Sequence, residues 1–196
     1  MVTIESDLKD WSEKVLEVPN PHLNGMPACP YARKAWMDNK VKVIETPDVL
    51  LSALLNRHLI GEYDLIIVAS FTMPDNETMQ LTIEQYNELA AYEDLHFMLF
   101  HPEYGADEAE LDFLYDHNWQ SSLDKEYCMV FIQSLSQVDD ASKQLEKKGY
   151  YSTFPADEYQ NLVLDRRNRR HGDETSCYEE KSPSKDDAWW QSDCPA

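Results

Sequence analysis

Apolar and polar positions follow two periods along this chain, and the two periods separate predicted helices from predicted strands. Residues 4–17 carry apolar side chains at helical spacing, which predicts an amphipathic helix. Five later stretches are rich in β-branched and aromatic residues and predict strands. These five stretches are residues 40–45, 63–71, 95–100, 127–133 and 150–154.

Helices are predicted between these strands from the signals that flank them. Thr46-Pro47-Asp48 supplies an N-cap hydroxyl and a proline at the first helical position, and Gly61 ends that helix. Thr82–Gln85 fits a capping box, so a second helix is expected to run to about Asp94. Further helices are predicted after Cys29, at about 107–117 and 137–148, and from Pro155 to near His171.

The alternation of strands and helices from residue 41 onward predicts the fold class. We expect an α/β or α+β fold, a single layered domain of about five strands in a ferredoxin-like or open-sheet arrangement. Residues 1–171 are long enough for one full core. Residues 172–196 are polar, acidic and aperiodic, which predicts a disordered acidic tail. Its Trp189-Trp190 pair is either an unpacked tail end or a peptide that binds a partner.

The net charge of -20 changes the range of expected partners. Nucleic acid is not expected, because phosphate binding requires clustered Lys and Arg. The basic run Arg166–Arg170 is either the solvated end of the last helix or an anion-binding patch. No run reaches the roughly 18 apolar residues of a membrane helix. The first residues lack the apolar core of a secretion signal, so we expect a cytoplasmic protein without a membrane partner.

Cys29 is the first candidate for chemistry. The four cysteines, at 29, 128, 177 and 194, show no C-x-x-C spacing, so neither a paired-cysteine zinc site nor a disulfide scaffold is predicted. Cys128 lies in an apolar run and is expected to be buried. Cys29 instead precedes a short helix that carries Arg33 and Lys34, a placement that favours a thiolate. The alternative is an inert cysteine packed under the proline-rich loop before it.

The second candidate is His101, together with Glu103, at the end of the predicted strand 95–100. Ligands of α/β folds bind where strands end, and Pro102 holds the two side chains in an extended segment. Imidazole and carboxylate together form an acid–base pair or two metal ligands. The alternative is a histidine that hydrogen-bonds and stabilises a loop.

Several of these segments resemble one family. The chain has Trp11 in its opening helix, then Cys29-Pro30-Tyr31-Ala32, Leu65–Val68 and Phe100–Tyr104. In that order these segments are similar to the layout of the bacterial domain-of-unknown-function family numbered 1415, over about residues 8–170. The chain departs from the family at Ser121–Tyr127, where the family has an arginine and prolines. The resemblance implies no activity.

Two functions are therefore expected as alternatives. The first is a thiol- or metal-dependent enzyme in which Cys29, His101 and Glu103 line one pocket and act on a small-molecule substrate. The second is a non-catalytic acidic adaptor that binds a protein partner through its surface and its tail. The sequence names no cofactor and no metal.

Overall fold

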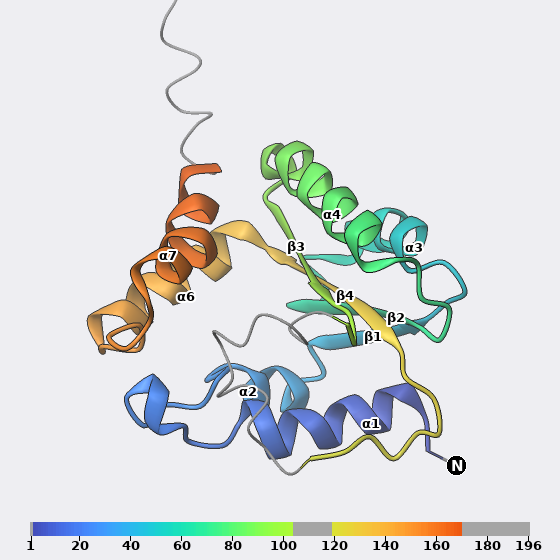
Figure 1. Ribbon diagram of the computed structural model, residues 1–196, viewed down its shortest axis with the longest axis horizontal. Helices are drawn as coiled ribbons and strands as arrows, with labels where there is room; N and C mark the ends of the chain where they lie inside the picture. Colours follow the sequence, from blue (N-terminus) through green and yellow to red (C-terminus); the bar gives the residue numbers. More distant parts are fainter. Residues whose placement is uncertain (1, 104–118, 170–196) are drawn as a thin grey trace, which may run out of the picture.

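The structure of the protein is a computed structural model, in which residues 2–103 and 119–169 are described. Its centre is a sheet with helices on both faces. Helices α3 and α4 cover one face, α1 and α2 cover the other, and α6 and α7 lie beyond one end of the sheet (Figure 1). No helix in these two ranges is long and apolar enough to cross a membrane. The fold class is therefore mixed α/β, as expected.

The sheet has four strands within the described residues, in the order β1-β2-β4-β3. Strands β1 and β2 pair in parallel, whereas β4 pairs antiparallel with both β2 and β3. The carboxyl ends of β1, β2 and β3 therefore lie at one edge, beside the start of β4. The strands are β1 Val41–Glu45, β2 Leu65–Ser70, β3 Leu95–Phe100 and β4 Cys128–Ser134.

The prediction of a strand at residues 150–154 is wrong. This segment forms turns, because Gly149 ends the preceding helix with a φ of 77° and redirects the chain. Its aromatic rings then pack on one another instead of pairing with a strand: Tyr151 lies 4.9 Å from Tyr150 and 5.2 Å from Phe154, centroid to centroid. Four strands are thus confirmed, and the ferredoxin-like arrangement is not.

The helices are α1 Ile4–Trp11, α2 Ala32–Met37, α3 Val49–Asn56, α4 Asn76–Ala90, α6 Leu135–Lys147 and α7 Ala156–Tyr159. Of these, α1, α3, α4 and α6 begin where a side chain accepts a hydrogen bond from a first-turn amide, whereas α2 and α7 have no such cap. Helix α3 is capped by Asp48 and not by the predicted Thr46, so Pro47 lies before the helix, and α4 is capped by Asp75. Helix α4 thus begins earlier than predicted, because Asp75 and not Thr82 is its N-cap. The helix predicted at 107–117 lies outside the described residues.

Each face of the sheet has its own apolar core. Ile66 and Val68 of β2 point toward α3 and α4, whereas Ile67 and Ala69 point toward α1. Because both faces of β2 are covered, its sequence is a continuous apolar run and does not alternate between apolar and polar residues. Phe97 is the largest side chain that is almost fully buried, and its ring lies edge-on to Tyr86 of α4.

A buried ion pair connects α6 to the helical segment that begins with α7 and continues to residue 169. Asp139 is fully buried, and Arg166 donates from Nε to its Oδ1 over 2.9 Å. Arg167 pairs with Glu146 over 2.9 Å. The reading of this basic run as a solvated helix end is therefore wrong for Arg166. Its charge is neutralised inside the protein, by a partner 27 residues earlier in the chain.

We expect Arg166→Ala to reduce the free energy of unfolding by about 3–5 kcal/mol, because it leaves the Asp139 carboxylate buried without its cation. The double variant Asp139→Leu/Arg166→Met should recover most of that loss. Urea unfolding measures both effects. Lys14→Ala, which breaks the exposed pair with Asp10, serves as the control and should cost about 0–1 kcal/mol. Equal losses for Arg166→Ala and Lys14→Ala would contradict the buried pair.

A second prediction concerns His96, whose Nδ1 donates to Asn87 Oδ1 over 3.1 Å. Burial, and then the charges of Arg166 and Arg169, lower the pKa of His96 to about 3. The unfolded chain takes up this proton near pH 6.5, so it binds more protons than the folded chain between these two pH values. Stability should therefore fall as the pH drops below 6.5, by about 1.4 kcal/mol per pH unit.

The measurement compares urea unfolding at pH 7 and pH 5 for the wild type and His96→Gln. The wild type should lose about 2 kcal/mol more than the variant over this interval. The exposed His58→Gln serves as the control and should behave as the wild type. Identical pH dependence in wild type and His96→Gln would show that His96 takes up its proton in the folded state.

Candidate functional site

The carboxyl edge of the sheet brings polar side chains from three strands together. Ser70 ends β2 and is the register partner of Cys128, which begins β4. Phe100 ends β3 opposite Met129, so His101 follows at the same edge. Because side chains alternate between faces, Ser70, Cys128 and His101 all belong to the face that α3 and α4 cover.

His101 is 8 % exposed, and both of its ring nitrogens contact backbone. Nε2 lies 3.1 Å from the carbonyl oxygen of Pro74, which can only accept, so Nε2 carries the proton. Nδ1 accepts from the Glu103 amide over 3.2 Å. The neutral ring thus fastens the loop after β2 to the loop after β3. One of these bonds would have to break before His101 could take up a proton from a substrate.

The structure places His101 and Glu103 close together, but through a turn at residues 102 and 103 and not through the extended segment predicted from the sequence. Nδ1 of His101 lies 4.0 Å from Oε2 of Glu103, whose carboxylate is exposed. Asp75 is a further neighbour that the sequence reading did not identify. Hydrogen bonds from Thr78, and to a lesser degree from the Glu77 amide, lower the pKa of Asp75. Asp75 is thus an ionised helix cap next to the candidate histidine.

Cys128 is fully buried at this edge, as expected from its apolar run. Its Sγ lies 3.7 Å from the carbonyl oxygens of Ser70 and Thr72, to which the thiol donates. Burial raises the pKa of Cys128. A fully buried thiol with a raised pKa is a structural group and not a nucleophile.

Cys29 is held in a different set of contacts. Its amide donates to Leu16 over 2.9 Å, and its carbonyl accepts from the Ala32 amide at the start of α2. Next to it, the hydroxyl of Tyr150 donates to the carbonyl of Ala28 over 2.6 Å. Burial raises the pKa of Cys29. This direction is opposite to the one expected from a helix start followed by two cations, because loss of water outweighs the amides that face the sulfur.

Cys29 and His101 have no hydrogen-bond or ion-pair partner in common in the part of the chain that the structure describes. A single pocket for both therefore stays a prediction. No group of three or more His, Cys, Asp or Glu side chains among the described residues is arranged to hold a metal ion.

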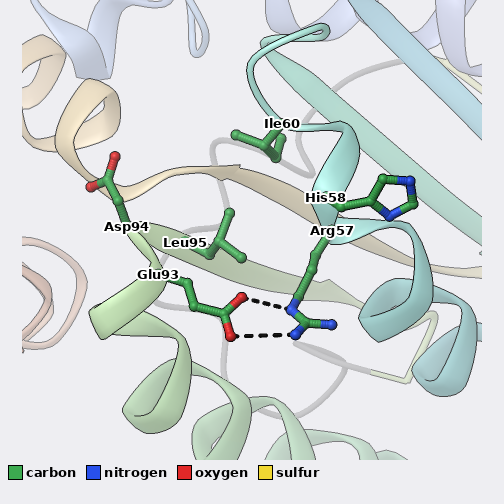
Figure 2. A pocket seen from close by; sticks show the side chains of 6 residues that line it. All are labelled: Arg57, His58, Ile60, Glu93, Asp94 and Leu95. Atoms are coloured by element: carbon green, nitrogen blue, oxygen red, sulfur yellow. Dashed lines mark hydrogen bonds and ion pairs between the residues drawn. The ribbon is translucent and has the colours of Figure 1, made fainter.

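An open depression lies at the other edge of the sheet, and no sequence signal marked it. Its volume is about 310 Å³, and Figure 2 shows Arg57 and Glu93 paired among the side chains that line it. Two hydrogen bonds of 2.8 and 3.3 Å join this pair, and Arg57 also donates to the carbonyl of Leu54. The depression is lined by Arg57, His58, Ile60, Glu93, Asp94 and Leu95. Both charges are occupied with each other, so neither is available to a ligand.

Large apolar side chains are exposed next to this depression, on α3, on α4 and on the short 3-10 helix Ala91–Glu93 that follows α4. We call them the α3–α4 outer surface. Its residues and their exposed fractions are Leu51 52 %, Leu55 63 %, Leu81 53 %, Leu89 73 % and Tyr92 77 %. Helices α3 and α4 pack on the same face of the sheet and lie side by side (Figure 1). The Arg57–Glu93 pair joins the turns that follow the two helices.

Comparisons with known proteins identify no relative of this chain. No family model, no curated protein and no solved structure matches the chain. The resemblance to family 1415 therefore stays a prediction, and the function has to be argued from the contacts above.

The rate of alkylation of Cys29 tests whether its thiol is activated. Because the pKa of Cys29 is raised, its thiolate fraction at pH 8 is small, and iodoacetamide should modify it roughly tenfold more slowly in the native protein than in guanidinium chloride. Mass spectrometry of the Cys29 peptide gives both rates, with N-acetylcysteine as the reagent control. The native rate should continue to rise above pH 9. A native rate faster than the unfolded one would reveal an activated thiolate and support catalysis.

Proposed function

We propose that this protein is a non-catalytic interaction protein, and that the α3–α4 outer surface is where its partner binds. The observation that supports the proposal is the set of five large apolar side chains exposed on α3, on α4 and on the short 3-10 helix that follows α4. Single exposed apolar residues are ordinary in soluble proteins, but a group of them on one face is typical of a binding site.

The fold does not need these side chains for its core. Helix α3 already buries Val49 and Ala53, and α4 already buries Met79, Ile83 and Ala90. Leu51, Leu55 and Leu81 lie on the side of their helix opposite the buried residues, and Leu89 lies on the flank of α4. At such exposed positions Lys, Glu or Gln would stabilise a helix as well as leucine does. Leucine and tyrosine at these positions are thus explained by binding and not by folding.

The geometry of the polar candidates also favours an interaction protein. The ring nitrogens of His101 are engaged with backbone, and burial raises the pKa of both Cys29 and Cys128. A catalytic function is the second proposal, and the 4.0 Å approach of His101 to Glu103 is the observation that favours it. It requires an activated Cys29, which the alkylation rates test. A cytoplasmic location fits both proposals.

Photo-crosslinking tests where a partner binds. Benzoylphenylalanine is introduced in place of Leu89, or in place of Met37 as the control, and the full chain is irradiated in extract of its own cells. Met37 is a matched position because it is 74 % exposed but lies on α2, across the sheet from α3 and α4. A discrete adduct should form at position 89 and be about tenfold weaker at position 37.

The same adduct should weaken when Leu55→Ser is combined with the crosslinker at position 89, because both positions belong to one surface. Circular dichroism checks that the variants remain folded. Adducts of equal strength at positions 89 and 37 would contradict the proposed surface, since they would report non-specific encounters.

A further inference from the structure

Carboxylates are interleaved with the apolar side chains on the outer side of α4. Leu81, Glu84, Glu88 and Tyr92 follow one another at intervals of three and four residues, which places them on one side of the helix. All four are exposed, and so is the neighbouring Leu89. The outer side of α4 therefore presents apolar contacts and negative charge to the same partner.

No basic residue lies within this part of the chain, although Arg169, which follows α7, is close enough to Glu88 for the two charges to interact. Residues 75–94 contain six acidic side chains and neither Lys nor Arg. Helix α3, Val49–Asn56, contains no charged residue. Arg57 follows α3 directly, but its guanidinium is paired with Glu93. The six acidic residues are Asp75, Glu77, Glu84, Glu88, Glu93 and Asp94.

We propose that the occupant of the α3–α4 outer surface is a basic amphipathic helix of a partner protein, an inference that rests on the proposed function. One side of such a helix would carry leucine-type residues onto Leu55 and Leu89. Lys or Arg on its flanks would face Glu84 and Glu88. Amphipathic helices commonly bind apolar surfaces in this way.

The charge of the chain argues against two other occupants. A second copy would bring together two chains of net charge -20, and two copies of the same acidic helix. The chain's own residues 172–196 contain seven Asp and Glu against two Lys, so they carry the same sign as α4. The negative potential that repels a second copy and residues 172–196 attracts a cationic partner.

The test uses the full chain and a fluorescein-labelled peptide of 18 residues with Leu and Lys at amphipathic helical spacing. Two peptides serve as comparisons: the same composition in scrambled order, and the same pattern with Glu in place of Lys. Fluorescence anisotropy at 0.15 M salt gives the affinities. The amphipathic Lys peptide should bind about tenfold more tightly than the scrambled one, and the Glu peptide should not bind.

Variants then locate the binding. Leu55→Ser/Leu89→Ser should weaken the Lys peptide about tenfold. Glu84→Gln/Glu88→Gln should weaken it about threefold and make the affinity less dependent on salt. The matched controls are Met37→Ser and Glu5→Gln/Glu13→Gln, which change exposed residues of the same types on the opposite face. These controls should bind as the wild type does.

Three results would overturn the inference. The first is equal binding of the scrambled or Glu peptide, and the second is an equal effect of the control variants. The third is a dimer in sedimentation that Leu55→Ser/Leu89→Ser dissociates, which would assign the surface to a second copy. If any of these accompanies a specific photo-adduct at position 89, only the chemistry of the partner is wrong. If no specific adduct forms either, the proposed function fails as well.

Discussion

The pairing of β4 with two neighbours is the interaction on which the rest of the structure depends. β4 comes last in the sequence of the four described strands, yet it lies between β2 and β3 and hydrogen-bonds to both. Its side chains enter both cores, Val130 and Ile132 on the α3–α4 face and Phe131 on the α1 face. Without β4, β3 would have no partner strand among the described residues. Ser134 at its end caps α6 and so positions Asp139 for Arg166.

This central strand also explains why the α3–α4 outer surface is free for another role. Helices α3 and α4 pack their buried apolar residues against one face of the sheet. Their packing on the sheet therefore does not depend on what covers their outer sides. The Arg57–Glu93 pair fastens their ends together across the depression. Two helices on a rigid support present their outward side chains in a fixed arrangement, which reduces the entropy that a partner loses on binding.

Local signals in the sequence predicted most of the fold. The strand at 95–100 and the start of α3 follow from apolar runs and capping residues only a few positions apart. Such local signals could not predict contacts between distant segments, such as Asp139 with Arg166 and His101 with Pro74. The sequence placed His101 correctly at a strand end. It could not show that both ring nitrogens are engaged with backbone, because one acceptor comes from another loop.

The acidic composition acquires a more specific meaning once it is placed on the fold. As a total, the charge of -20 predicts only that polyanions are not partners. On the α3–α4 outer surface, the same charge surrounds leucines that would otherwise promote self-association, and like charges on two copies oppose that association. A cationic helix is not subject to this repulsion. Under the proposed function, carboxylates beside exposed leucines would therefore oppose self-association and, at the same time, favour a cationic partner.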